Sequence, residues 1–202
     1  MAQSKLIMFD FDGVIVDSLD HQCRAFVETV RAKGFADLAT PERFLEFTES
    51  NWFEALAAAG VPASVVSEVE DAFGAAPSPE LFPGMAAVIE RLAATHSVIV
   101  ITSSRTDVVE RVVAKHCVRG VAEVVGGDRD ESKTRKIDDA RRRFGRALAA
   151  WYVGDTVGDI LEARRAGAGT VGAAWGWHGS ERLRRANPDY MAHAPTDLLD
   201  LF

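Results

Sequence analysis

Four aspartates at two places in the chain have the types and spacing for metal binding and for acid, base or nucleophilic chemistry. Asp10 and Asp12 follow the apolar run KLIMF two residues apart, so they share a face while the chain stays extended. Asp155 and Asp159 stand four residues apart at the start of a predicted helix, a spacing that puts side chains about 5–6 Å apart. Carboxylates crowded in this way repel one another unless a cation neutralises them. Mg²⁺ suits such an all-oxygen site because it retains waters that a phosphate ligand can replace.

Two simpler interpretations compete with a magnesium site. Asp155 and Asp159, taken alone, would merely favour a helix N-terminus electrostatically. An EF-hand loop needs a glycine at its sixth position and a glutamate at its twelfth. Here Gly13 follows Asp10 by three residues, and the twelfth position is His21, so the EF-hand interpretation fails.

Candidate phosphate donors follow two other predicted elements. Thr102 ends the apolar run SVIVIT, and the amides of Ser103 and Ser104 are expected to open the next helix, an arrangement that suits an anion. Thr102 is also compatible with a helix N-cap. Lys133 stands at the N-terminal edge of a later helix, where its ammonium can act as a point charge. Lys136 is the competing lysine, one turn further in, where we expect it to be solvated.

The elements that must position these residues alternate between short β-branched runs and helical patterns, which is typical of a parallel sheet covered by helices. Predicted strands span 5–9, 97–102, 121–125, 148–153 and 169–173, with a weaker one near Tyr190. Predicted helices span 85–94, 134–144 and 156–166, and valines at i, i+4 spacing indicate another one between the second and third strands. Because ligands bind beyond the carboxyl ends of such strands, the polar residues above should gather at one edge of the sheet.

Residues 18–78 break this alternation and read as helices alone, over 19–33, 41–59 and 63–73. Leu45, Trp52, Leu56 and Ala59 form a predicted buried stripe on the second of these helices. The Pro/Gly-rich stretch GAAPSPELFPG that follows suits a hinge or linker. The sequence therefore predicts an α/β core domain made of residues 1–17 and 79–202, interrupted by a helical domain at 18–78.

Composition excludes several classes of protein. In 202 residues the hydrophobic share is 48%, the charged share is 26% and the net charge is −7, which predicts a packed globular protein without a nucleic-acid or anionic-membrane surface. No apolar run reaches the length of a transmembrane helix, and no signal-peptide pattern opens the chain. Cys23 and Cys117 form no CxxC pattern. We therefore expect a cytoplasmic protein with reduced thiols, and the sequence leaves its oligomeric state open.

Four segments, DFDGVIVDS, VIVITSS, ESKTRKI and YVGDTVGDI, resemble in this order the four motifs of the haloacid dehalogenase superfamily. The helical insertion stands where that superfamily carries a helical cap domain. The stretch ELFPGMAAVIERL and the C-terminal tail are similar to the phosphoglycolate-phosphatase-like branch. The resemblance implies a doubly wound, Rossmann-like parallel sheet with strand order 5-4-1-2-3, numbered along the chain, and an inserted all-helical cap.

The resemblance also implies roles for the acidic residues. Asp10 would be the nucleophile that forms an aspartyl-phosphate, ionised at its ordinary pKa of about 3.9. Asp12 would be the general acid and base, with a pKa pushed apart from that of Asp10. Asp10, the Asp12 carbonyl and Asp155 would hold Mg²⁺, with Asp159 orienting a ligand or water.

The same resemblance assigns the phosphoryl oxygens to Thr102, Ser103 and Lys133. Dehalogenases of the superfamily typically lack the second aspartate, since a halide needs no proton, so Asp12 favours phosphate chemistry. Many sugar-phosphate relatives carry a histidine twelve residues after the nucleophile; here that position is Gln22, and His21 falls one residue early. This departure disfavours a sugar-phosphate mutase or a sugar phosphatase without excluding either.

The predicted helical domain should select the substrate. Between residues 18 and 80 there are four basic residues against eleven acidic ones, which makes a second strongly anionic group on the substrate harder to accommodate. Glu49, Asn51 and Trp52 are candidate contacts there, and His178 is a candidate at the sheet edge.

The sequence therefore predicts a Mg²⁺-dependent phosphatase of small phosphorylated metabolites, phosphoglycolate-like or other phosphate monoesters. A phosphomutase that uses the same intermediate is the first alternative, and a catalytically silent binding protein on this fold is the second.

Overall fold

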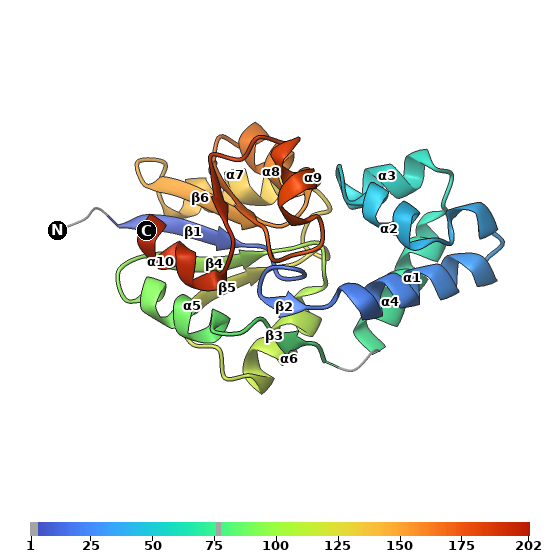
Figure 1. Ribbon diagram of the computed structural model, residues 1–202, viewed down its shortest axis with the longest axis horizontal. Helices are drawn as coiled ribbons and strands as arrows, with labels where there is room; N and C mark the ends of the chain where they lie inside the picture. Colours follow the sequence, from blue (N-terminus) through green and yellow to red (C-terminus); the bar gives the residue numbers. More distant parts are fainter. Residues whose placement is uncertain (1–3, 76–77) are drawn as a thin grey trace.

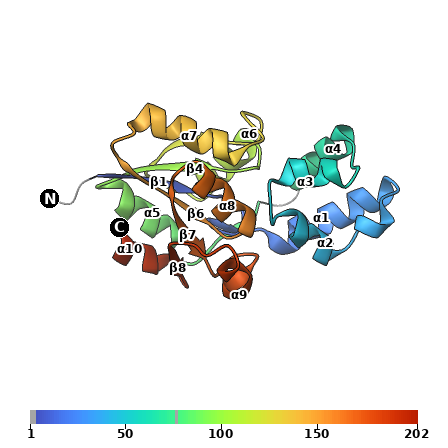
Figure 2. The same ribbon diagram turned by 90° about the horizontal axis from the view of Figure 1, so that it is seen from above.

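The computed structural model describes residues 4–75 and 78–202 and is built around a parallel sheet (Figures 1 and 2). The described residues form a six-stranded sheet of order β5-β4-β1-β6-β7-β8. In sequence order the strands are β1 (Lys5–Phe9), β4 (Ser97–Ile101), β5 (Val121–Val125), β6 (Ala149–Gly154), β7 (Gly169–Ala173) and β8 (Tyr190–Ala192). Counted as the five predicted strands, this is the order 5-4-1-2-3, with the weaker strand added beside the fifth, so the predicted fold class and strand order are confirmed.

Helices cover both faces of this sheet because the strand side chains alternate between them. Leu6 and Met8 of β1 join the apolar cluster of α7 and α8, whereas Ile7 and Phe9 join the cluster of α5, α6 and α10. All four side chains are fully buried, as expected for a central parallel strand. The helices of this core span Met85–Ala93 (α5), Thr106–Lys115 (α6), Lys133–Phe144 (α7), Val157–Arg165 (α8), Gly179–Arg184 (α9) and Leu198–Leu201 (α10), with a 3₁₀ turn at Pro195–Asp197.

Four described helices lie beside the carboxyl ends of the strands and form a helical module with its own core (Figure 1). They are α1 (Leu19–Ala32), α2 (Pro41–Phe47), α3 (Trp52–Ala58) and α4 (Ala63–Ala75), with a 3₁₀ turn at Ala36–Leu38. The chain enters and leaves the module through an antiparallel pair, β2 (Val16–Asp17) with β3 (Glu80–Leu81). The domain bounds 18–78 and 1–17 with 79–202 stay a prediction, and residues 1–3, 76 and 77 lie outside the described part of the chain.

The single predicted helix over 41–59 is wrong, because two helices occupy this range. Thr48 ends α2, and the Asn51 side chain caps α3 by accepting a hydrogen bond from the amide of Glu54 at 3.1 Å. The predicted apolar stripe nevertheless packs into one cluster, in which Trp52 and Leu56 are buried. A heptad spacing between Leu45 and Trp52 does not reveal the break, because a residue seven positions on returns to nearly the same face.

The structure also bears on the expected absence of a transmembrane helix and on the expected reduced thiols. Among the described residues, no helix combines the length and apolar character that crossing a membrane would require. Cys23 and Cys117 are free thiols, the second of them exposed.

The module's stability should depend on Phe26, which is fully buried and contacts the rings of Phe44, Phe47 and Trp52 at centroid distances of 5.3, 5.9 and 5.7 Å. We expect Phe26→Ala to lower the free energy of unfolding by about 3–5 kcal/mol, through lost apolar burial and the cavity left behind. Chemical denaturation monitored by circular dichroism measures this change. Glu28→Ala, at an exposed position of the same helix, is the control and should change it little.

Candidate active site

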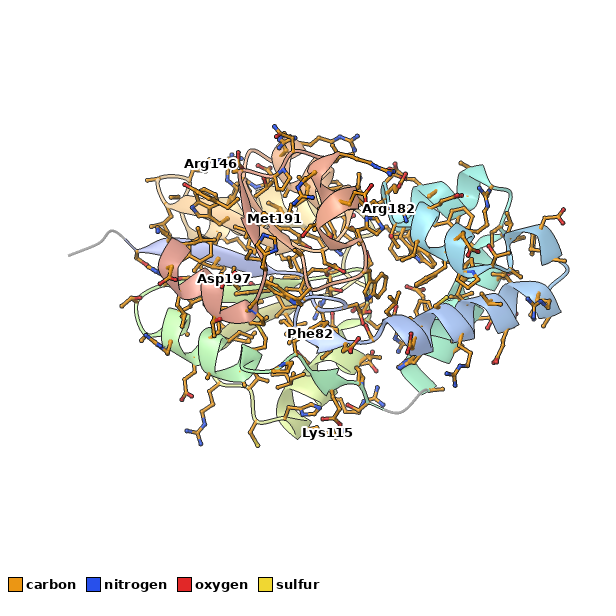
Figure 3. All side chains as sticks on the ribbon, in the orientation of Figure 1. Phe82, Lys115, Arg146, Arg182, Met191 and Asp197 are labelled. Carbon is orange, nitrogen blue, oxygen red and sulfur yellow. The ribbon has the colours of Figure 1, made fainter. Side chains whose placement is uncertain are left out.

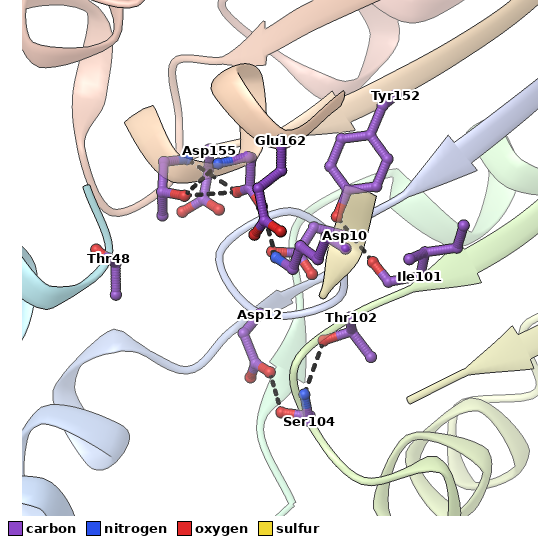
Figure 4. Close-up of polar contacts among 12 residues, drawn as sticks. Asp10, Asp12, Thr48, Ile101, Thr102, Ser104, Tyr152, Asp155 and Glu162 are labelled. Carbon is purple, nitrogen blue, oxygen red and sulfur yellow. Dashed lines mark hydrogen bonds and ion pairs between the residues drawn. The ribbon is translucent and has the colours of Figure 1, made fainter. Parts of the chain in front are cut away.

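The predicted site residues meet at the carboxyl ends of β1, β4 and β6 (Figure 4). The cavity between the sheet and the helical module is lined by six of the candidate site residues, namely Asp10, Asp12, Thr102, Ser103, Lys133 and Asp159. Asp155, directly after β6, is fully buried and does not line the cavity. It nevertheless offers a carboxylate oxygen within 4.8 Å of oxygens from Asp10 and Asp159.

The environment of Asp10, Asp155 and Asp159 fits a hard divalent cation. The Oδ1 atoms of Asp10 and Asp155 are buried and have no hydrogen-bond partner among the described residues. A buried carboxylate oxygen left unpaired is unfavourable, and a cation would satisfy both atoms. All candidate ligand atoms are oxygens, the donors that Mg²⁺ prefers.

Two glycines leave the space that Asp155 occupies. A Cβ atom on Gly13, whose φ is +74°, would clash with Oδ2 of Asp155, and a Cβ atom on Gly176 would clash with the Asp155 side chain. Oδ2 of Asp155 accepts a hydrogen bond from the amide of Trp177 at 2.7 Å. The loops after β1 and β7 therefore fix this carboxylate with one oxygen paired and the other available.

Lys133 is the cation that the chain itself supplies. Its Nζ lies 2.9 Å from Oδ2 of Asp10 and 2.5 Å from Oδ1 of Asp159, and 5.9 Å from the centre of the Tyr152 ring. Burial disfavours the charged ammonium, but Asp10 and Asp159 outweigh burial and raise the pKa of Lys133 well above its ordinary value. Lys133 therefore remains charged beside Asp10, at the place expected for a phosphoryl contact.

Asp159 has two structural partners as well as its place in the cluster. Its Oδ2 accepts hydrogen bonds from the amide and hydroxyl of Thr156, which completes a capping box at the start of α8. Burial opposes its ionisation, but the charge of Lys133 and these hydrogen bonds lower the pKa of Asp159 below its ordinary value. The helix-terminus interpretation and the metal-site interpretation are thus compatible.

The pKa values of the other two carboxyl groups in the cluster, those of Asp10 and Asp155, are raised. Burial raises the pKa of Asp10 to about 7, although Lys133 opposes the shift, so the expected ordinary value is wrong. Burial, followed by the charges of Asp159 and Asp10, raises the pKa of Asp155 well above its ordinary value. A divalent cation held by these groups would favour their ionised forms.

Asp12 is held by neutral donors. Its Oδ1 accepts hydrogen bonds from Ser18 Oγ at 2.7 Å and Gln22 Nε2 at 2.5 Å. Its Oδ2 accepts one from Ser104 Oγ at 2.5 Å (Figure 4). Burial raises the pKa of Asp12, and the hydrogen bonds from Ser104 and Ser18 oppose that shift. A raised pKa suits a group that must donate and accept protons.

From the sequence, Gln22 was noted only because many sugar-phosphate relatives carry histidine at that position, and no role was predicted for its side chain. No role was predicted for the Ser18 side chain either, and only the amide of Ser104 was considered. The available signal was position: Ser18 and Gln22 stand four residues apart in the first turn of α1, on the face that meets the loop after β1. His21 does not line the cavity.

Thr102 and Lys136 support the loop after β4. Helix α6 begins at Thr106 and its N-cap residue is Arg105, so the expected helix start at Ser103 is wrong, as is a capping role for Thr102. The Thr102 hydroxyl instead accepts a hydrogen bond from the amide of Ser104 at 3.1 Å.

Lys136 was expected to be solvated, and this is wrong, since it is buried and donates hydrogen bonds to the carbonyl oxygens of Thr102 at 2.6 Å and Gly126 at 3.2 Å. The preceding apolar strands place these carbonyls beneath α7, where a long side chain reaches them. Burial, together with the charge of Lys133, lowers the pKa of Lys136 to about 8.

The loop between α2 and α3 docks the helical module onto the core. The amide of Gly158 donates a hydrogen bond to the carbonyl of Thr48 at 3.1 Å, and Asn51 Nδ2 donates one to the carbonyl of Glu131 at 2.9 Å. Arg182, on the side of the core that faces the module (Figure 3), pairs with Glu49 at 2.6 Å. Glu49 and Asn51 therefore join the two parts, whereas Trp52 lines the cavity.

His178 links the same loop to α8 through a neutral ring. Its Nδ1 accepts a hydrogen bond from the amide of Val157 at 3.0 Å, so the proton resides on Nε2, which faces Thr48 Oγ1 at 2.9 Å and the carbonyl of Leu45 at 3.2 Å. Burial, and next the charge of Arg182, lowers the pKa of His178 to about 4. Protonation would remove the acceptor that Val157 uses.

This arrangement predicts a pH-dependent stability. The pKa of His178 rises from about 4 in the folded protein to its ordinary value of 6.5 on unfolding, so its contribution is complete above pH 6.5 and is lost as the pH falls toward 4. Between pH 7 and pH 5, we expect the wild type to lose about 2 kcal/mol of unfolding free energy relative to His178→Gln. Urea denaturation at both pH values measures the difference.

The control for this experiment is His193→Gln, at an exposed position. It should follow the wild type at both pH values. If the unfolding free energies of the wild type and His178→Gln changed equally with pH, the result would contradict the neutral, buried state of the ring.

The comparisons with known proteins agree with this geometry. Residues 7–173 match the family model of haloacid dehalogenase-like hydrolases. Over 202 aligned residues the chain is 29% identical to a phosphoglycolate phosphatase of Synechococcus elongatus, with 96% of this chain and 94% of the relative covered. A haloacid dehalogenase-like hydrolase of Streptococcus pneumoniae shares the fold over 100% of both chains, with a TM-score of 0.79 and 24% identity.

A protein of Bacteroides vulgatus named as a beta-phosphoglucomutase also shares the fold, with a TM-score of 0.77 and 16% identity over 98% of this chain and 87% of that one. The family model matches most of the chain and includes each of the four aspartates at the sheet edge. The chain therefore belongs to the haloacid dehalogenase-like hydrolases, and within them it is similar to phosphoglycolate phosphatases.

Proposed function

We propose that this protein is a Mg²⁺-dependent phosphatase that hydrolyses a small phosphate monoester, phosphoglycolate-like or other, through an aspartyl-phosphate on Asp10. A single observation carries the proposal: Asp10 and Asp12 line the same cavity, one against the charge of Lys133 and the other against neutral donors. The two carboxylates thus have environments suited to a nucleophile and to an acid and base. The name of the Synechococcus elongatus relative supports the reaction type.

In the first step, a carboxylate oxygen of Asp10 attacks the phosphorus atom of the substrate. The bond between phosphorus and the ester oxygen breaks, and protonated Asp12 gives its proton to the departing alcohol. The raised pKa of Asp12 favours the protonated form that this step needs. Ser18, Gln22 and Ser104 keep the carboxyl group in place.

In the second step, Asp12, now ionised, removes a proton from a water molecule. The water oxygen bonds to phosphorus, the bond to Asp10 breaks, and inorganic phosphate leaves with Asp10 restored as a carboxylate. Asp12 is again protonated, so the cycle balances in protons.

Asp10, Asp155 and Asp159, together with the main-chain carbonyl of Asp12, would hold Mg²⁺, which supplies positive charge against the phosphoryl oxygens. The two unpartnered oxygens on Asp10 and Asp155 support this ligand set. Asp159 is already tied to Lys133 and Thr156, which suits an orienting role.

Thr102, Ser103 and Lys133 line the cavity beside Asp10 and are the proposed contacts to the phosphoryl oxygens. The helical module closes the same cavity with residues of α2, α3 and α4 and would exclude bulk water during the reaction. A cytoplasmic location remains a prediction from the sequence.

A phosphomutase would use the same first step and return the phosphoryl group to a substrate hydroxyl rather than to water. This alternative is considered because the Bacteroides vulgatus protein named as a beta-phosphoglucomutase shares the fold. Gln22, whose side-chain amide donates a hydrogen bond to Asp12, stands where many sugar-phosphate relatives carry histidine, which disfavours a mutase that acts on sugar phosphates. Measuring both phosphate release and substrate isomerisation separates the two reactions.

The wild type with Mg²⁺ should release phosphate from p-nitrophenyl phosphate, and chelation by EDTA should abolish the release. Asp10→Asn removes the nucleophilic carboxylate, so we expect kcat to fall at least about 10³-fold. Asp17→Asn, at an exposed position of β2, is the matched control and should retain activity. Continuous absorbance assays of p-nitrophenol release measure the activity of the wild type, with and without EDTA, and of both variants.

Thermal unfolding of both variants verifies that they are folded. The absence of turnover by the wild type, on p-nitrophenyl phosphate and on a panel of phosphorylated metabolites, would support the silent binding protein instead. Equal activity of Asp10→Asn and the wild type would contradict the assignment of the nucleophile.

A further inference from the structure

The part of the cavity formed by the helical module is aromatic. Phe44, Trp52 and Phe73 line it from α2, α3 and α4, and Trp177 lines it from the loop after β7. The ring centres of Phe44 and Trp177 lie 5.3 Å apart, and those of Trp52 and Phe73 lie 6.2 Å apart. These spacings are those of interacting aromatic pairs, so the rings form one continuous apolar wall.

The same cavity offers little positive charge beyond the phosphate contacts. Among the described residues that line it, the cations are Lys133 and Arg105. Lys133 is bound by Asp10 and Asp159. Arg105 is half exposed and pairs with Asp71 at 3.3 Å and Asp107 at 3.0 Å.

The helical module also contributes a carboxylate to the cavity lining. Glu70 of α4 lines the cavity in the same helix as Phe73. Burial raises its pKa, and Arg105 opposes the shift. An anionic group near Glu70 would be repelled, whereas a hydrogen-bond donor would be favoured.

We propose that the substrate's alcohol part is a flat apolar ring without an anionic group of its own, seated against Phe44, Trp52 and Phe73 with its far edge toward Glu70. This inference rests on the proposed phosphatase function and narrows its substrate class. It places phosphoglycolate, whose alcohol part is glycolate and carries a carboxylate, among the poor substrates. An aromatic wall contributes binding free energy to an apolar ring and none to an anion that must lose its hydration.

Two pairs of phosphate monoesters that differ by one carboxylate test the inference. The first pair is benzyl phosphate and 4-carboxybenzyl phosphate, and the second is 2-hydroxyethyl phosphate and phosphoglycolate. In each pair, we expect kcat/KM to be at least about tenfold higher for the monoester without a carboxylate. Of all four compounds, benzyl phosphate should have the highest kcat/KM. Equal or higher kcat/KM for the carboxylate members would overturn the inference.

Two variants of α4 test separately the repulsion by Glu70 and the ring contact of Phe73. Glu70→Gln should reduce the preference between benzyl and 4-carboxybenzyl phosphate by about tenfold, because it removes the repelling charge. Phe73→Leu should lower kcat/KM for benzyl phosphate more than for 2-hydroxyethyl phosphate. Glu68→Gln, at an exposed position of α4 that pairs with Lys33, is the matched control and should preserve both ratios. Unchanged ratios in Glu70→Gln and Phe73→Leu would also overturn the inference.

A binding measurement separates this inference from the proposed function. Calorimetric titration with benzylphosphonate and 4-carboxybenzylphosphonate, in the presence of Mg²⁺, requires no catalysis. Tighter binding of benzylphosphonate without turnover of any monoester would leave the inference intact and overturn the phosphatase. Rapid hydrolysis of phosphoglycolate with weak binding of benzylphosphonate would leave the phosphatase intact and overturn the inference.

Discussion

The ammonium of Lys133 between Asp10 and Asp159 is the interaction on which the rest of the site depends. Asp10, Asp155 and Asp159 are almost fully buried within one cluster, so burial and then their mutual repulsion disfavour ionised carboxylates there. The Lys133 ammonium, 2.9 Å from Asp10, opposes this effect, while the Oδ1 atoms of Asp10 and Asp155 have no hydrogen-bond partner among the described residues. The central strand β1 and the adjacent starts of α7 and α8 hold these groups together, so the sheet topology is what makes the cluster possible.

The helical module contributes aromatic side chains and the carboxylate of Glu70 to the cavity beside this cluster. Its α2–α3 loop is fixed to the core through Thr48 and Asn51 and through the neutral ring of His178. That docking places the aromatic wall and the carboxylates of Asp10 and Asp12 around one cavity, which is lined by residues from two separately packed parts. The proposed chemistry and the proposed recognition therefore depend on different segments of the chain, which a few polar contacts join.

Much of the fold and the centre of the site could be predicted from the sequence, because they depend on local signals. The apolar runs before Asp10 and Asp155 mark strands, and parallel strands bring their carboxyl ends to one edge. The contacts of Lys136 and Gln22 could not be predicted, because each depends on a carbonyl or carboxylate brought close by tertiary packing. The raised pKa of Asp10 likewise depends on burial. The break between α2 and α3 was hidden because a heptad spacing keeps the apolar face continuous across it.

The central claim is that the phosphoryl group passes through Asp10. Rapid acid quench of the wild type during turnover, followed by proteolysis and mass spectrometry, tests this claim most directly. We expect a peptide containing Asp10 that carries one phosphoryl group, formed before phosphate is released and absent without Mg²⁺. Phosphate release with no labelled peptide at any time during turnover, or a phosphoryl group on another residue, would contradict it.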